Sequence, residues 1–301
     1  MRVTVTGATG LIGAKLVEDL QRRGDEVTVL SRSPDKAEGQ LGVDAVAWDP
    51  ESGPAPAAAL EGRDAVVHLA GEPVAQRWND EVKERIRRSR ELGTRNLVEG
   101  IKLADPRPAA LISSSAVGFY GPHGDERLDE DTRPGSDFLA EVVVIWEREA
   151  DRAAELGLRV VKVRTGVVLD SEGGALKTML TPFKLGVGGP VASGDQYMPW
   201  IHVDDVVGIL SRAVHDESWS GAVNATAPEP VTNKAFSKAL GSALHRPALA
   251  PVPAFAIKLL YGEMATIVVN GQRALPRRTQ ELGYTFAHPD LDEALRSALA
   301  D

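Results

Sequence analysis

Short apolar runs alternate with helical stripes from the first residues of the chain. Residues 2–6 and 26–30 are runs rich in valine and threonine, which is typical of buried strands. Between them, apolar residues recur at helical spacing over residues 14–23, and Gly24 follows. This order predicts a βαβ unit, in which two parallel strands flank one helix.

The same alternation continues to about residue 225. Further strands are expected over residues 43–49, 65–71, 109–115, 158–169 and 221–226. Helices are expected over residues 79–104, 137–147 and 233–244, and glycine-rich turns over residues 173–190. We therefore predict an α/β fold, a doubly wound parallel Rossmann sheet with a smaller C-terminal α/β lobe on the substrate side.

Three glycines lie where the first strand turns into the first helix, in Thr6-Gly-Ala-Thr-Gly-Leu-Ile-Gly13. Gly7 permits a tight turn, Gly10 lets the backbone approach a pyrophosphate, and Gly13 lets helix and strand pack closely. The helix N-terminus adds unpaired N–H groups and a positive dipole end. A glycine turn without a ligand is the simpler alternative. The strand–turn–helix context favours a dinucleotide turn made by Gly7, Thr9, Gly10, Leu11, Ile12 and Gly13.

The end of the second strand indicates which nicotinamide cofactor fits. An NAD-dependent enzyme usually carries Asp or Glu here, because a carboxylate accepts hydrogen bonds from the ribose 2′-hydroxyl. This chain has Ser31 and Arg32 instead. A guanidinium offers planar, bidentate hydrogen bonds to a phosphate. We therefore predict NADP(H), with a solvated arginine at a strand end as the alternative.

Composition narrows the class of protein further. The chain has 301 residues, a net charge of −9 and a pI of about 5.3, which argues against nucleic acid as a main partner. It has no cysteine, and its 6 histidines show no metal-ligand spacing, so no metal site is expected. No apolar run reaches membrane-spanning length, and Met1 leads directly into the first strand. We expect a cytoplasmic protein without a membrane partner.

The glycine turn also resembles the Gly-x-x-Gly-x-x-Gly signature of the extended short-chain dehydrogenase/reductase superfamily. By that resemblance, His68-Leu-Ala-Gly71 lines the adenine and ribose side. Ser113-Ser-Ser-Ala, followed by Tyr120-Gly, resembles the active-site strand of sugar-nucleotide epimerases and dehydratases. The resemblance implies that Ser115 binds the substrate oxygen, and that the segment from Arg164 passes the nicotinamide. Beside the turn residues, the expected cofactor contacts are Ser31, Arg32, Leu69, Ala70, Gly71, Glu72, Arg77, Arg164, Gly166 and Val167.

The sequence departs from the superfamily at its catalytic dyad, Tyr-x-x-x-Lys, whose members share one helix face. There is no Tyr between Tyr120 and Tyr197, and no Lys in the expected helix over residues 137–147. Two hypotheses stay open. Either Tyr120 donates the proton with Ser115 as its partner, or Asp137 or Glu141 acts as acid/base if burial raises its pKa. For both acids, the alternative is a solvated helix residue.

Several further motifs together resemble one atypical epimerase-family branch that lacks the dyad. They are Phe138-Leu-Ala-Glu141, Leu185-Gly-Val-Gly-Gly-Pro190, Pro199-Trp-Ile-His-Val-Asp-Asp205 and Gly271-Gln-Arg-Ala-Leu-Pro276. The resemblance implies an NADP(H)-dependent oxidoreductase or epimerase for a hydroxyl- or carbonyl-bearing metabolite, with a nucleotide sugar as one candidate. A cofactor-responsive binding protein without turnover is the alternative. We also expect a monomer or homodimer with a small-molecule substrate. The NADP-binding Rossmann domain is expected over residues 1–170, completed by about 200–225, with the smaller lobe over 171–199 and 226–301.

Overall fold

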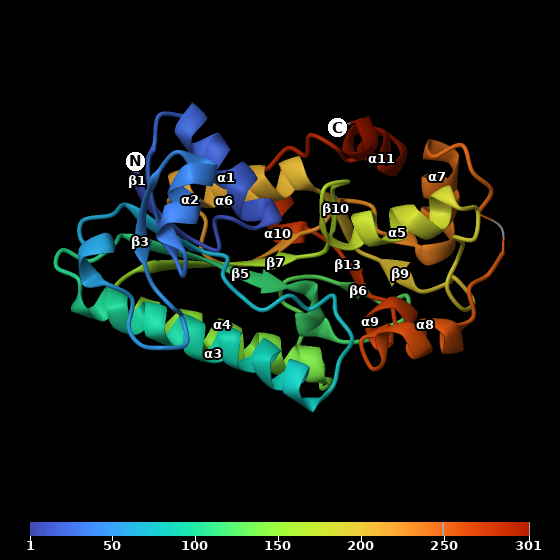
Figure 1. The fold of residues 1–301 in the computed structure, drawn as a ribbon, viewed down its shortest axis with the longest axis horizontal. Helices are drawn as coiled ribbons and strands as arrows, with labels where there is room; N and C mark the ends of the chain where they lie inside the picture. The colour runs from blue at the N-terminus through green and yellow to red at the C-terminus, as the bar shows by residue number, and fades with distance from the viewer. Residues whose placement is uncertain (249, 301) are drawn as a thin grey trace.

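The computed structural model describes residues 1–248 and 250–300, and its centre is a seven-stranded parallel sheet. The strand order is β11-β7-β5-β4-β1-β2-β3, which confirms the predicted doubly wound Rossmann fold. The sheet runs through the middle of the molecule in Figure 1. Its strands are β1 (Arg2–Thr6), β2 (Glu26–Ser31), β3 (Asp44–Ala47), β4 (Ala65–His68), β5 (Ala110–Ala116), β7 (Arg159–Thr165) and β11 (Gly221–Ala225).

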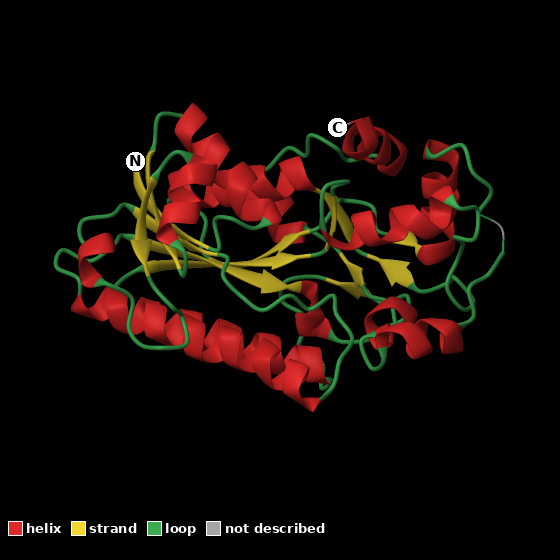
Figure 2. Cartoon of the chain, viewed as in Figure 1, coloured by secondary structure: helices red, strands yellow, loops and turns green. Residues whose placement is uncertain are grey.

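Helices cover both faces of the sheet, as Figure 2 shows. One face carries α3 (Asp80–Leu103) and α4 (Phe138–Glu155), and the other carries α1 (Leu11–Arg22), α2 (Pro34–Leu41) and α6 (Val203–His215). Strand residues alternate between two separate cores. Val67 packs on the α1–α6 side, whereas its neighbour Val66 packs on the α3–α4 side. Because both faces are buried, these strands read as nearly continuous apolar runs.

The smaller lobe lies beyond one end of the sheet, where α5, α7, α8 and α9 gather in Figure 1. Its core joins Leu176, Phe183, Trp200, Phe236 and Leu295, all of them buried. The remaining helices are α5 (Gly174–Lys184), α7 (Asn233–Ala243), α8 (Ala254–Tyr261), α9 (Ala265–Val269), α10 (Arg277–Glu281) and α11 (Leu291–Ala300), with short 3-10 turns η1 (Ala57–Ala59) and η2 (Val117–Tyr120). The remaining strands are β6 (Arg127–Leu128), β8 (Val167–Leu169), β9 (Tyr197–Met198), β10 (Trp200–His202), β12 (Val231–Thr232) and β13 (Arg273–Ala274).

The expected strand over residues 158–169 is in fact two strands. β7 ends at Thr165, and β8 leaves the main sheet to pair with β10. Gly166 lies between them, and a Cβ there would come within 2.3 Å of the Pro199 carbonyl oxygen. The backbone therefore turns at the one residue small enough for this contact. Apolar periodicity could not indicate the break, because both halves are hydrophobic.

The glycine-rich segment over residues 173–190 was expected to form turns, but its centre is the helix α5. Gly173 precedes this helix, and Gly186, Gly188 and Gly189 follow it. The glycines thus flank the helix, where turns are needed. The apolar side chains between them form the helix face that packs in the lobe core.

Asp205 anchors the C-terminal segment to the Rossmann part of the chain. Its carboxylate accepts hydrogen bonds from the backbone N–H of Ala287 at 2.7 Å and of His288 at 3.0 Å. Tyr284 donates its hydroxyl proton to the same carboxylate at 3.2 Å, and Phe286 enters the α1–α6 core. Helix α6 begins at Val203, so Asp204 and Asp205 lie in its first turn. The carboxylate of Asp205 nevertheless binds a distant loop rather than capping its own helix.

No helix in the described ranges, 1–248 and 250–300, combines the length and the apolar character that crossing a bilayer requires.

Candidate functional site

The glycine turn lies against the end of the neighbouring strand β4. Gly7 has a φ of +69°, and a Cβ there would lie 2.6 Å from the Leu69 carbonyl carbon and 2.7 Å from the Ala70 nitrogen. The turn thus needs glycine both for its backbone conformation and for its close approach to residues 69–70. Gly13 is equally confined, because its Cβ would lie 2.3 Å from the Gly7 carbonyl oxygen. Tight packing alone accounts for these two glycines.

The third glycine lies at an open helix end. Gly10 is exposed and is the N-cap of α1, with no side chain accepting hydrogen bonds from the first turn. The first turn also contains no acidic residue. No side chain therefore caps the N–H groups of the first turn of α1, and no nearby carboxylate in that turn offsets the positive end of the helix dipole. Both features suit an anion-binding turn. The helix begins at Leu11, earlier than the apolar pattern indicated, so Leu11 and Ile12 belong to this first turn.

Arg32 follows β2 at the same edge of the sheet. Its side chain is exposed, and the hydroxyl of Ser31 accepts a hydrogen bond from the Ser33 N–H at 3.1 Å. The charge of Arg32 acts on Glu72, in the loop after β4. The pKa of the Glu72 carboxyl is lowered by hydrogen bonding to Gln76, then by Arg85, and by the more distant charge of Arg32. An exposed cation therefore stands beside the glycine turn, facing a loop carboxylate.

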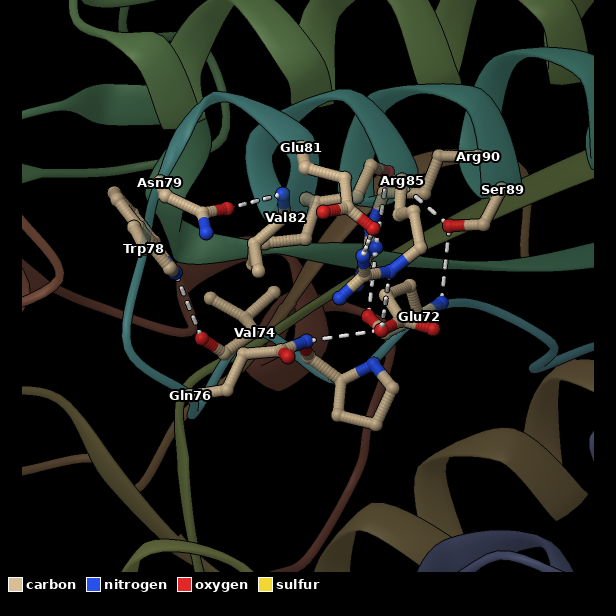
Figure 3. Close-up of polar contacts among 12 residues, drawn as sticks. Glu72, Val74, Gln76, Trp78, Asn79, Glu81, Val82, Arg85, Ser89 and Arg90 are labelled. Carbon is tan, nitrogen blue, oxygen red and sulfur yellow. Dashed lines mark hydrogen bonds and ion pairs between the residues drawn. The ribbon is translucent and has the colours of Figure 1, made fainter.

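The loop after β4 is held by hydrogen bonds and ion pairs to α3, which Figure 3 shows, and by further hydrogen bonds to α8. Glu72 accepts a hydrogen bond from Gln76 at 3.0 Å and pairs with Arg85 at 3.4 Å. Its carbonyl oxygen accepts from Arg90 at 3.0 Å. Arg77 instead donates to the backbone carbonyls of Leu259 and Leu260 in α8. Of the two charged residues of this loop that were predicted to contact the cofactor, Glu72 is bound to Gln76 and Arg85, and Arg77 binds the loop to the lobe.

Strand register brings three polar residues into one row. Ser115 of β5 pairs with Arg164 of β7, and Arg164 pairs with Asn224 of β11. Above this row, Glu147 of α4 forms a two-point ion pair with Arg164, at 2.8 and 2.9 Å. Ser115 donates its hydroxyl proton to the same carboxylate at 2.6 Å. Sequence reasoning missed Glu147, and its apolar neighbours in the helix gave no signal for it.

Tyr120 lies inside this network rather than in an open loop. It ends η2, is fully buried, donates its hydroxyl proton to Asn224 at 2.8 Å and accepts a hydrogen bond from Arg164 at 3.2 Å. Burial raises its pKa to about 12, although Arg164 and Asn224 act in the opposite direction. The hydroxyl is therefore protonated, with both its proton and an acceptor site in use. As a proton donor, Tyr120 would first have to give up these contacts.

The two acids proposed as acid/base residues lie at the start of α4. Asp137 is the N-cap and accepts a hydrogen bond from the Ala140 N–H at 2.9 Å. Glu141 is exposed and lies 3.7 Å from Arg87. The hypothesis required burial, and Glu141 does not meet that condition because its position on α4 faces solvent. Asp137 has the capping role that its residue type favours.

The segment expected to pass the nicotinamide is fixed by an ion pair and hydrogen bonds. Arg164 is 4% exposed, and its guanidinium is bound by Glu147, by Tyr120 and by the Glu130 carbonyl oxygen. Val167 donates its N–H to the Pro199 carbonyl at 2.7 Å. These contacts place Arg164 under the carboxyl edge, where it supports Ser115 and Tyr120.

His68 has the packed structural role that burial favours. Its ring lies 2.7 Å from the Thr6 hydroxyl and 3.1 Å from the Thr94 hydroxyl, and it is fully buried. Burial, together with the nearby charge of Arg90, lowers its pKa to about 4. The imidazole is therefore neutral at pH 7 and links β1, β4 and α3 beneath the glycine turn.

Two surface hollows lie away from these residues. One, of about 470 Å³, is lined in part by Asp25, Val27 and Asp44, and the other, of about 560 Å³, by residues 102–108 and 156–158. Both border the amino ends of strands. Ligands of doubly wound sheets bind at the opposite, carboxyl edge, where the glycine turn, Arg32 and Ser115 lie.

The fold and the glycine turn together define an α/β protein of the Rossmann class. The sequence profile of the "NAD dependent epimerase/dehydratase family" matches residues 3–224, and that of a "Domain of unknown function (DUF1731)" matches residues 252–298. The chain belongs to the NAD dependent epimerase/dehydratase family. This confirms the resemblance drawn from the motifs.

Relatives match along the whole chain. "Epimerase family protein SDR39U1 homolog, chloroplastic" of Arabidopsis thaliana is 41% identical, over 99% of this chain and 87% of its own length. The crystal structure of human epimerase family protein SDR39U1 (isoform 2) with NADPH is 37% identical, covers 100% of both chains and has a TM-score of 0.88. A nucleoside-diphosphate sugar epimerase from Corynebacterium glutamicum is 36% identical with a TM-score of 0.81, covering 99% of this chain and 58% of its own.

Replacing Tyr120 by Phe should destabilise the fold. The change leaves Asn224 Oδ1 and one Arg164 N–H without their buried partner, and we expect a loss of about 1–3 kcal/mol in the free energy of unfolding. Urea denaturation measures it. Tyr261→Phe, on the half-buried Tyr261 of α8, should change stability by less than about 0.5 kcal/mol. Equal stability of Tyr120→Phe and the wild type would show that the buried network does not depend on this hydroxyl.

His68 should make stability depend on pH. Its folded pKa of about 4 lies below the ordinary 6.5, so the unfolded chain binds the proton more readily. The stabilisation is complete above pH 6.5 and is lost as pH falls towards 4, by about 3 kcal/mol. Urea denaturation of the wild type and of His68→Asn at pH 7 and pH 4 isolates the contribution of His68 to the free energy of unfolding, because the other groups titrate alike in the two proteins. The wild type should lose more stability than the variant, and parallel losses would contradict the prediction.

Proposed function

We propose that this chain is an NADP(H)-binding, epimerase-family oxidoreductase acting on the hydroxyl or carbonyl group of a small metabolite, with a nucleotide sugar as one candidate. The observation that carries the proposal is the open N-terminus of α1 beside the exposed Arg32. Together they offer N–H donors for a pyrophosphate and a cation for a 2′-phosphate. The NADPH in the human relative's crystal structure supports this choice of cofactor.

The residues proposed to hold the cofactor are those of the sheet's carboxyl edge. Gly7, Thr9, Gly10, Leu11, Ile12 and Gly13 would bind the pyrophosphate, Ser31 and Arg32 the 2′-phosphate, and Leu69 to Glu72 the adenosine side. Gly166 and Val167 follow β7 at the same edge and remain proposed neighbours of the nicotinamide. Arg77 and Arg164 act through other residues, since their guanidinium groups are engaged with α8 and Glu147.

Ser115 is the proposed substrate-binding hydroxyl. NADP(H) supplies hydride exchange when bound, and the chain must orient the substrate oxygen. Arg164 forms a two-point ion pair with Glu147, and this carboxylate accepts a hydrogen bond of 2.6 Å from the Ser115 hydroxyl. The Ser115 oxygen can then accept a hydrogen bond but cannot readily donate one. This polarity suits a substrate hydroxyl, which is itself a donor.

The second candidate is an NADP(H)-responsive binding protein that performs no turnover. A specific observation favours it: the two hydroxyls nearest to a possible reaction centre are buried and engaged. Ser115 is 3% exposed and Tyr120 is 0% exposed. The helix that carries the Tyr-x-x-x-Lys pair in the superfamily offers Glu147 and capping acids instead.

Arg32 should determine the choice between NADPH and NADH. We expect NADPH to bind at least about tenfold more tightly than NADH, because a charge-assisted phosphate contact contributes on the order of 1.5–3 kcal/mol. Arg32→Ala should remove the preference and leave NADH affinity nearly unchanged. Calorimetric or fluorescence titration of both dinucleotides measures this.

Arg107→Ala is the matched control, since Arg107 is also exposed but precedes β5 at the amino edge of the sheet. It should keep the NADPH preference. Equal affinity of the wild type for both dinucleotides would remove Arg32 from the site. Binding of neither would overturn the proposed function.

Turnover, where a screen finds it, should depend on Ser115. A panel of sugar nucleotides, alcohols and carbonyl compounds is assayed by nicotinamide absorbance and by product analysis. Ser115→Ala should lower kcat by about 10²-fold, the scale of a misplaced substrate. Ser114→Ala is the control, because successive strand residues face opposite sides of the sheet. Full activity of Ser115→Ala would exclude Ser115 from the mechanism, and absence of turnover across the panel supports the binding protein.

A further inference from the structure

Two histidines and an aspartate meet where α6 begins. His202 ends β10, Asp204 lies in the first turn of α6, and His288 comes from the loop before α11. One donor atom of each lies within 4.8 Å of the others. Asp204 Oδ2 is 3.4 Å from His202 Nδ1 and 3.2 Å from His288 Nε2. Sequence spacing could not indicate this cluster, because its third member lies 84 residues beyond the second.

We propose that His202, Asp204 and His288 form a binding site for a divalent transition-metal ion of the zinc class. Two donors of a tetrahedral zinc site lie about 3.3 Å apart when the metal–donor bonds are about 2.0–2.1 Å. The two separations of 3.2 and 3.4 Å match this edge. Two imidazoles and one carboxylate are also an established donor set for zinc, with a fourth position left for water.

The tautomer of His202 directs a lone pair towards the cluster. Nδ1 accepts the Asp204 N–H at 3.2 Å, so the ring proton resides on Nε2, which is buried without a partner in the described part of the chain. The Nδ1 lone pair therefore faces Asp204. A bound metal would replace the backbone N–H as its partner. The cap that is lost contributes little beside a metal–nitrogen bond.

The backbone already holds the donors in place. Asp205 accepts the N–H groups of Ala287 and His288, which fixes the loop that carries the third ligand. His202 is 2% exposed, and its ring centroid lies 3.8 Å from that of His288. Ordering a loop on binding opposes metal affinity. Here the hydrogen bonds to Asp205 already order the loop before any metal binds.

The surroundings favour a cation and leave it a route of entry. The first turn of α6 places the carboxylates of Asp204 and Asp205 directly after His202. The side chains of Asp204 and His288 are 58% and 20% exposed, so the cluster opens to solvent on its outer side. A bound ion would join the start of α6 to the C-terminal loop. The ion would therefore act as a structural clip for that loop.

Metal titration of the full chain tests the proposal, after the chain is treated with chelator and freed of any histidine tag. We expect Zn²⁺ at about 100 times its Kd to raise the Tm by roughly 5 °C. Co²⁺ should develop the strong visible absorption of a four-coordinate ion. His288→Ala and Asp204→Asn should each weaken the affinity for both ions by about tenfold or more.

His123→Ala is the matched control, because His123 lies 2.9 Å from Glu126 and no third ligand group joins this pair among residues 1–248 and 250–300. It should bind Zn²⁺ as the wild type does. Asp204→Asn keeps the size of an exposed side chain, so it remains informative if His288→Ala fails to fold. No saturable Zn²⁺ or Co²⁺ binding, or undiminished binding by Asp204→Asn, would overturn the proposal.

Discussion

The ion pair between Glu147 and Arg164 is the interaction on which the carboxyl edge of the sheet depends. Two charges taken out of water are costly, and the pair is stable only because its remaining hydrogen-bonding groups are satisfied. Arg164 binds Glu147 twice, reaches Tyr120 and the Glu130 carbonyl, and lies 3.4 Å from the centre of the Phe119 ring. Helix α4 and strands β5 and β7 are thereby joined at one point. Removing either partner would leave the other as an unpaired buried charge, and its desolvation would then destabilise the fold.

This pair also explains how the chain differs from the pattern of its superfamily. A lysine on this helix would place a positive charge beside the strand serine, whereas Glu147 places a negative one there. Arg164 of β7, rather than solvent, neutralises the charge of Glu147. As a result the serine proton points towards the helix, and the tyrosine hydroxyl is held within the sheet layer. Helix α4 thus contributes a carboxylate that accepts the Ser115 hydrogen bond, and it carries neither a tyrosine nor a lysine.

Sequence reasoning predicted what local chemistry determines. The strands, the glycine turn and the long helix from Asp80 follow from periodicity and capping within a few residues. It failed where distant segments meet. Gly166 breaks a strand because Pro199 approaches it, and Glu147 meets Ser115 through a register that no single segment encodes. His288 reaches Asp204 only because Asp205 holds its loop. The burial of Tyr120 is likewise set by β11, whose Asn224 arrives 104 residues later.

The two ends of the carboxyl edge are prepared to different degrees. At the glycine turn, the helix N-terminus has no side-chain cap, and Arg32 is exposed, so a ligand would gain contacts without breaking any. At Ser115 the polar groups are already paired with one another, and a substrate would have to exchange hydrogen bonds to charged groups, each of about 1.5–3 kcal/mol. Binding of a dinucleotide therefore requires little reorganisation of the chain, whereas chemistry at Ser115 requires the network to rearrange. The architecture separates these two steps physically, so a cofactor could bind without committing the site to reaction.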